Sequence, residues 1–177
     1  MKLSSETLDQ MPSSVSVPNY DRSKLTAGII HIGLGNFHRG HQAWYLHRLM
    51  QQGKARDWAI LGAGVRHNDA AMRERLLAQD CLTTLIELDP QKTSIEITGS
   101  MIDFLPVEEN NAALIKAMSV PAIRIVAMTV TEGGYYRNVD GTLNTTHPDI
   151  VHDAANTASP RTAFGAMVAA YGARRAA

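Results

Sequence analysis

Apolar and polar positions along the chain predict strands and helices that alternate over most of its length. Residues 28–32 form a short apolar run, which predicts a buried strand. Residues 42–52 carry apolar side chains at helical spacing, and Gly53 ends that helix. The predicted order is a strand at 28–32, a helix at 42–52, a strand at 58–61 that continues toward 65, a helix capped by Asn68 or Asp69, strands at 82–88, 94–98 and 101–105, a helix after Pro106, a strand at 123–130, a short helix at 148–154 and a last helix from 162.

This alternation predicts an α/β fold, a Rossmann-like, doubly wound and mainly parallel sheet. Residues 82–105 alternate in a way that predicts an antiparallel excursion, and the long apolar run at 123–130 is typical of a central parallel strand. Residues 1–27 are interpreted as an irregular or partly helical arm, and 28–177 as the sheet domain. Because such a domain normally returns to its sheet after a last helix, we expect it to be incomplete at its C-terminus; a complete small domain is the alternative.

A glycine turn follows the first predicted strand and suggests a phosphate site. Gly33, Gly35 and Asn36 would offer backbone N–H groups to a pyrophosphate at the start of the next helix. The third glycine of the usual G-x-G-x-x-G pattern is replaced by His38. A nicotinamide dinucleotide, a flavin and S-adenosylmethionine therefore all stay open on this pattern.

Other side chains of the turn are further candidates for roles in the site. Arg39 would bind a phosphate oxygen or pair with a surface carboxylate, and Phe37 is expected to pack under the start of the helix. His38 and His41 lie three residues apart, on one face of a helix. Two such histidines could hold a metal, but the sequence shows no second ligand cluster, so we predict a structural role and no metal site.

The ends of the second and the last predicted strand supply the remaining candidates. An acid after the second strand usually accepts from the adenosine ribose, and Asp69 is the best match; capping the next helix is its alternative role. Arg66, His67 and Asn68 would instead tolerate a 2′-phosphate, so NAD is favoured and NADP remains open. Thr131 and Glu132 would line the nicotinamide end, where Glu132 either handles protons or is a solvated carboxylate.

The composition of the chain argues against several other classes of protein. The chain has 177 residues, is 45% hydrophobic and 19% charged, and has zero formal net charge. Without a basic stripe, nucleic acid is not expected as a partner. The single cysteine, Cys81, excludes internal disulfides and fits a cytoplasmic protein. The first twenty residues lack the apolar core of a secretory signal, and no apolar run is long enough to span a membrane.

Several motifs together resemble the mannitol dehydrogenase family of long-chain polyol dehydrogenases. The segment at 31–43, His-Ile-Gly-Leu-Gly-Asn-Phe-His-Arg-Gly-His-Gln-Ala, carries most of the resemblance. Further matching segments are 57–60 (Asp-Trp-Ala-Ile), 62–66 (Gly-Ala-Gly-Val-Arg), 78–80 (Ala-Gln-Asp), 131–135 (Thr-Glu-Gly-Gly-Tyr) and 159–165 (Ser-Pro-Arg-Thr-Ala-Phe-Gly). The similarity runs over essentially the whole chain.

The resemblance implies an NAD(P)-binding domain followed by a helical domain that carries the catalytic lysine and asparagines. Those catalytic positions are expected beyond residue 177. The implied reaction is zinc-independent hydride transfer of the mannitol-to-fructose type, with a polyol or ketose substrate and a full-length protein that is often monomeric. The glycine loop matches the family's cofactor site, and Asp69 its ribose-binding acid, whereas Asn68 stands where many relatives have a second acid.

Two functions follow as hypotheses. The first is the cofactor-binding portion of an NAD-dependent polyol dehydrogenase, inactive by itself. The alternative is a stand-alone, truncated dinucleotide-binding module without catalysis.

Overall fold

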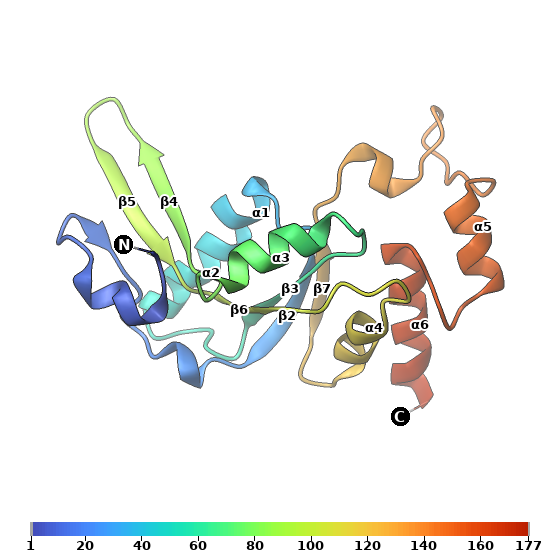
Figure 1. Ribbon diagram of the computed structural model, residues 1–177, viewed down its shortest axis with the longest axis horizontal. Helices are drawn as coiled ribbons and strands as arrows, with labels where there is room; N and C mark the ends of the chain where they lie inside the picture. Colours follow the sequence, from blue (N-terminus) through green and yellow to red (C-terminus); the bar gives the residue numbers. More distant parts are fainter. Residues whose placement is uncertain (1, 177) are drawn as a thin grey trace.

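The computed structural model describes residues 2–176 and divides them into a parallel sheet with helices on both faces and a smaller second sheet (Figure 1). The elements in chain order are η1 (Ser5–Gln10), β1 (Val15–Ser16), η2 (Arg22–Lys24), β2 (Ala27–Ile32), α1 (Asn36–Gly40), α2 (Gln42–Gln51), β3 (Ala59–Ala63), α3 (Asp69–Leu77), β4 (Thr83–Leu88), β5 (Thr93–Thr98), β6 (Met101–Phe104), α4 (Ala112–Ser119), β7 (Ile125–Met128), η3 (Glu132–Tyr135), α5 (Pro148–Ala155) and α6 (Ala163–Ala176).

The larger sheet has the strand order β6-β3-β2-β7, and every neighbouring pair is parallel. In chain order the strands lie 3-2-1-4, so the winding reverses between β2 and β7. A reversal of this kind opens a crevice at the carboxyl ends of the strands, where α/β proteins bind their ligands. The predicted Rossmann-like, doubly wound fold is confirmed.

The core lies on both faces of this sheet because β2 alternates its side chains between them. Ile30 and Ile32 pack with α4 and α6 on one face, and Ile29 packs with α2 and α3 on the other. All three side chains are buried. Burial on both faces explains why β2 is apolar almost throughout rather than alternating. None of the helices described between residues 2 and 176 is both long and apolar enough to cross a membrane.

The smaller sheet contains the predicted antiparallel hairpin. β4 pairs antiparallel with β5 from Thr83 opposite Thr98 to Leu88 opposite Thr93. The excursion is shorter than predicted, because β6 leaves it and joins β3 in the parallel sheet.

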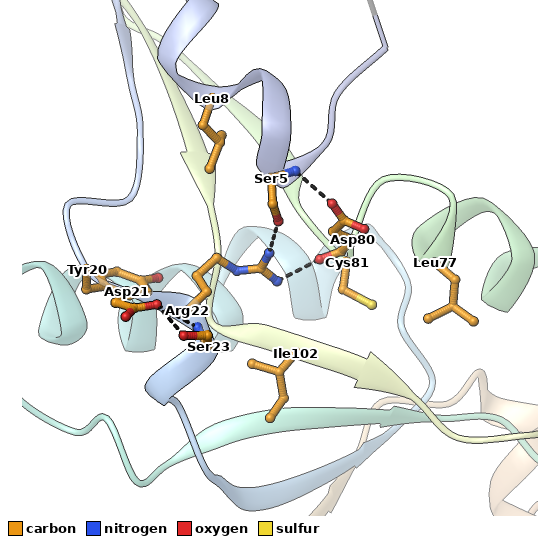
Figure 2. A pocket seen from close by; sticks show the side chains of 10 residues that line it. All are labelled: Ser5, Leu8, Tyr20, Asp21, Arg22, Ser23, Leu77, Asp80, Cys81 and Ile102. Carbon is orange, nitrogen blue, oxygen red and sulfur yellow. Dashed lines mark hydrogen bonds between the residues drawn. The ribbon is translucent and has the colours of Figure 1, made fainter.

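The N-terminal arm is more ordered than the sequence indicated, since β1 pairs parallel with β5. Arg22 ties the arm to the domain. Its guanidinium donates to the Ser5 hydroxyl and to the Asp80 carbonyl (Figure 2). It also donates to the carbonyls of Gly99 and Met101. A two-residue strand is too short to show a period, so hydrophobic patterning could not reveal it.

Two further expectations need correction. The strand predicted at 123–130 is shortened to β7, which pairs only with β2 among the described strands and is half-exposed at the sheet edge, not central. Val126 and Met128 pack against the core cluster that includes residues of α4 and α6, whereas Ile125 is exposed. An apolar run therefore does not by itself distinguish an edge strand from a central one. The helix expected directly after Pro106 begins later, at Ala112, behind Asn111 in a left-handed conformation.

Candidate functional site

A cavity of about 170 Å³ lies where the carboxyl ends of β2, β3 and β7 meet. It brings together four residues singled out from the sequence, Gly33, Arg66, Asp69 and Thr131. The remaining lining residues are Ile32, Val65, Thr129 and Val130. The cavity therefore occupies the crevice that the reversed winding creates.

Gly33 joins the turn to the neighbouring strand. Its φ is +90°, and a Cβ there would lie 2.3 Å from the carbonyl oxygen of Thr129. The Thr129 hydroxyl donates to the Gly33 carbonyl at 2.8 Å and accepts from Nε2 of His31 at 2.9 Å. Gly33 is thus required for the close approach of β2 and β7. Sequence reasoning missed Thr129, although a threonine that ends an apolar strand was the available signal.

Gly35 behaves differently from Gly33. Its φ is −67°, and a Cβ would meet no atom within 4 Å. It stands directly before α1, where the first backbone N–H groups of a helix have no partner within the helix. Gly35 and Asn36 therefore present open backbone to an incoming group.

Arg39 faces away from the crevice. One of its guanidinium nitrogens donates to the Asn36 side-chain oxygen, and Arg39 lines a separate cavity of about 360 Å³ between α1 and β4. The structure gives it no carboxylate partner among residues 2–176. The expected surface ion pair is therefore not seen, and the phosphate contact stays a prediction.

Phe37 does not pack under the helix as expected; it is 66% exposed and stacks on the His41 ring at 4.3 Å. The two histidines also do not share a face: His38 is buried, whereas His41 is exposed and donates from Nδ1 to the Phe37 carbonyl. The reason is that α1 ends at Gly40 and the chain turns at His41, so the helical period does not continue from one histidine to the other.

His38 stacks instead on His31, a residue that sequence reasoning did not select, with ring centroids 3.7 Å apart. Burial, helped by the neighbouring imidazole of His31, lowers the pKa of His38 to about 3, and burial also lowers the pKa of His31. Both rings are therefore neutral near pH 7, next to the glycine turn. Over residues 2–176, neither belongs to a group of three or more metal-ligating side chains.

Asp69 closes the loop that follows β3. Its Oδ2 accepts from the backbone N–H groups of Val65 and Arg66, each at 3.0 Å. Its Oδ1 accepts no hydrogen bond from any described residue and so can still accept from a ligand. The carboxylate shapes the loop and borders the cavity, but it does not cap α3: Asp69 is the first residue of that helix, and its N-cap, Asn68, makes no side-chain hydrogen bond. The capping role considered from the sequence is therefore wrong, and the ribose contact stays a prediction.

The opposite wall of the crevice is the turn after β7. The Thr131 carbonyl accepts from the Gly134 N–H at 2.7 Å, which fixes η3, and Glu132 is exposed at its first position. Burial raises the pKa of Tyr136, and the Arg66 guanidinium opposes that rise. Nη2 of Arg66 lies 3.6 Å from where a Cβ of Gly134 would stand, so Arg66 reaches across from the β3 loop to the η3 turn.

The segment at 159–165 lies outside the crevice. The carboxylate of Asp153, which is buried, accepts from the backbone N–H groups of Arg161 and Thr162 and from the Thr162 hydroxyl. A Cβ on Gly165 would lie 2.3 Å from this carboxylate. This motif therefore holds α5 against the start of α6.

The strand order and the crevice define a Rossmann-type α/β domain. A family model described as the mannitol dehydrogenase Rossmann domain matches residues 27–177. The chain belongs to the mannitol dehydrogenase family.

Relatives and solved structures agree with this assignment. The chain is 62% identical to mannitol 2-dehydrogenase of Cereibacter sphaeroides over 93% of this chain and 35% of that protein, and 43% identical to mannitol 2-dehydrogenase of Phaeosphaeria nodorum over 100% of this chain and 31% of that protein. The ternary complex of Pseudomonas fluorescens mannitol 2-dehydrogenase with NAD and D-mannitol superimposes with a TM-score of 0.94 at 43% identity, over 99% of this chain and 36% of that chain. A substrate-free D-sorbitol dehydrogenase gives 0.90 at 37% identity, over 99% of this chain and 37% of that chain. The chain thus spans about a third of the length of these proteins.

Proposed function

We propose that this chain is the cofactor-binding portion of an NAD-dependent polyol dehydrogenase that transfers hydride between a mannitol-type polyol and its ketose. The observation that carries the proposal is the cavity at the carboxyl ends of β2, β3 and β7, lined by Gly33, Asp69 and Thr131. The similar Pseudomonas fluorescens enzyme was solved with NAD and D-mannitol, which supports the choice of cofactor and substrate.

The residues of the crevice fit a dinucleotide. Beside the cavity, the backbone at Gly35 and Asn36 would receive the pyrophosphate, since a Cβ on Gly35 would meet no atom within 4 Å. The free Oδ1 of Asp69 would accept from the adenosine ribose. Thr131 and Glu132 would border the nicotinamide end, where Glu132 is the one titratable group offered for proton transfer.

Of the proposed site residues, Gly33, Asp69 and Thr131 line the cavity, whereas Gly35, Asn36, Phe37, Arg39 and Glu132 do not. Arg39 would hold the turn through Asn36, and Phe37 would shield the turn from solvent. When bound, NAD supplies a ring that accepts hydride; the residues of this chain hold and orient it.

The proposal also covers the domain organisation, the cellular location and the partners of the protein. We assign residues 28–177 to cofactor binding and 1–27 to an arm, and we expect the proton-transferring lysine and asparagines in a further helical part of the protein. We propose zinc-independent chemistry in the cytoplasm, no nucleic-acid or membrane partner, and a full-length protein that is monomeric.

Titration calorimetry with NAD tests the site. Asp69→Asn keeps an acceptor for the two loop amides and removes the charge, so we expect binding about tenfold weaker at unchanged urea stability. Asp9→Ala, which removes an exposed carboxylate of η1, is the matched control and should bind NAD like the parent. Equal NAD affinity in Asp69→Asn and the parent protein would remove Asp69 from the site.

Turnover separates the two functional hypotheses. NADH formation with mannitol by the full-length gene product supports the dehydrogenase. Tight NAD binding by that product with no oxidation of any polyol supports the binding module instead.

A further inference from the structure

His31 stands in β2, directly before the glycine turn and outside the crevice. Its side chain is 3% exposed and lines a second cavity, of about 410 Å³, bordered by β2, α1 and α2. Thr129 is the one residue that lines both this cavity and the crevice. Its hydroxyl lies 2.9 Å from Nε2 of His31. His31 is therefore connected to the crevice through Thr129, although it does not line the crevice itself.

The hydrogen bonds of Thr129 determine which ring nitrogen of His31 carries a hydrogen. The Thr129 hydroxyl has a single proton, and the Gly33 carbonyl, 2.8 Å away, can only accept it. Toward Nε2 of His31 the same oxygen must therefore accept, so Nε2 carries a hydrogen. Burial lowers the pKa of His31, so the ring is neutral at about pH 7 and its Nδ1 has no hydrogen.

This chain of hydrogen bonds orients the peptide group between Gly33 and Leu34. The Gly33 N–H donates to the Ala63 carbonyl at 3.0 Å and the Gly33 carbonyl accepts from Thr129, so both polar groups of this glycine are held. In a trans peptide the C=O and the following N–H point in opposite directions, so the Leu34 N–H is turned away from Thr129. That N–H has no backbone partner among residues 2–176 and is free to donate to an anion at the turn.

We infer that His31 is a positioning residue for the coenzyme: its Nε2–H holds the Thr129 hydroxyl on the Gly33 carbonyl and so sets the direction of the Leu34 N–H. This role rests on the proposed function and adds to it a residue that does not touch the ligand. Without the Nε2–H, the Thr129 hydroxyl loses the contact that fixes its rotamer. His38 steadies the imidazole of His31, because the two buried rings stack with centroids 3.7 Å apart.

Two substitutions of His31 separate the hydrogen bond from the packing of the ring. His31→Phe keeps a flat ring against His38 and removes the donor, so calorimetric titration of the full chain should show NAD binding about five- to tenfold weaker. His31→Gln removes the ring and keeps a side-chain N–H donor, so its NAD affinity should stay within about threefold of the parent's. A role in packing alone predicts the opposite order, since phenylalanine replaces the ring better than glutamine does, and that order would overturn the inference.

A double-mutant cycle tests whether His31 acts through Thr129. Thr129→Val removes the hydroxyl, and the double variant with His31→Phe should bind NAD about as weakly as Thr129→Val alone. Losses that multiply in the double variant would overturn the inference. Thr129→Ser keeps the hydroxyl and should bind within about threefold of the parent. His152→Phe is the matched control, because it removes a histidine hydrogen bond to the Ser159 carbonyl outside the crevice and should leave NAD affinity unchanged.

Nitrogen-15 NMR of the imidazole rings measures the tautomer directly. At about pH 7 His31 should be the neutral Nε2–H tautomer, and the Nδ1–H tautomer would overturn the inference. Failure of this inference is distinguishable from failure of the proposed function. A parent protein that binds NAD, with no loss in His31→Phe, overturns the role of His31 alone. A parent protein that does not bind NAD overturns the proposed function and the role of His31 with it.

Discussion

Two glycines of one turn, Gly33 and Gly35, should respond in opposite ways to the same added methyl group. In Gly33→Ala the new Cβ would lie 2.3 Å from the Thr129 carbonyl oxygen, where ordinary contacts begin near 3.4 Å, and the residue would keep a φ of +90°. In Gly35→Ala the methyl meets no atom within 4 Å, at a φ of −67°. The pair therefore separates a glycine that the fold requires from one that leaves room for a ligand.

The expected cost for Gly33→Ala follows from two contributions. A left-handed conformation costs a non-glycine residue about 1–2 kcal/mol. Relieving the clash moves the Thr129 carbonyl by about an ångström and strains the Thr129–Gly33 hydrogen bond, for about another 0.5–1.5 kcal/mol. The total is about 1.5–3.5 kcal/mol of the free energy of unfolding. Gly35→Ala should cost less than about 1 kcal/mol, mainly because alanine is a poorer N-cap than glycine.

Urea unfolding followed by circular dichroism measures both variants. With a slope of about 2 kcal/mol per molar urea, the midpoint of Gly33→Ala should fall by about 0.8–1.8 M, and that of Gly35→Ala by less than about 0.5 M. For NAD affinity we expect a loss in Gly35→Ala, the variant that is hardly destabilised. Its methyl group lies where the pyrophosphate would approach, so this variant should bind NAD about tenfold more weakly than the parent protein. A Gly33→Ala protein as stable as the parent would refute the packing argument, and unchanged NAD affinity in Gly35→Ala would refute the ligand argument.

Three further predictions concern stability. Asp153→Ala should lower the free energy of unfolding by about 2–4 kcal/mol in urea unfolding, because both the backbone N–H and the hydroxyl of Thr162 lose a buried acceptor; a loss below about 1 kcal/mol would contradict this. Because the folded-state pKa of His38 is about 3 and its ordinary value is 6.5, the unfolded chain binds a proton between those values that the folded chain does not, so stability should fall as pH falls from 6.5 toward 3. Free energies of unfolding from urea titrations at about pH 7 and about pH 5 should differ less in His38→Gln than in the parent, by up to about 1.4 kcal/mol per pH unit. Equal pH slopes would refute the assignment. Arg124→Ala should cost only about 1 kcal/mol in thermal unfolding, since its 2.8 Å ion pair with Asp57 is partly exposed; a loss above about 3 kcal/mol would show that the pair is stronger than its exposure implies.

The order of strands and helices was predictable from the sequence, because apolar residues recur with a different spacing in strands and in helices. The apolar run of β2 and the helical spacing of α2 are local patterns, and a chain that alternates them can pack only as a layered α/β sheet. The glycine turn and Asp69 could also be found, since a turn after a strand and an acid after the next strand are read from short stretches of residues.

The remaining features of the fold and of the candidate site depend on contacts between segments far apart in the sequence, which no local pattern of residues predicts. The sequence could not show that β7 lies at an edge, that His38 turns inward onto His31, or that Phe37 is left exposed, because each depends on what packs against the segment. The different roles of Gly33 and Gly35 also come from tertiary structure: only the approach of Thr129 makes the first glycine indispensable to packing. The type of each element and the chemistry of its side chains follow from short stretches of sequence. Which side chains are buried, and which lie close together, depends on how segments far apart in the chain pack against one another.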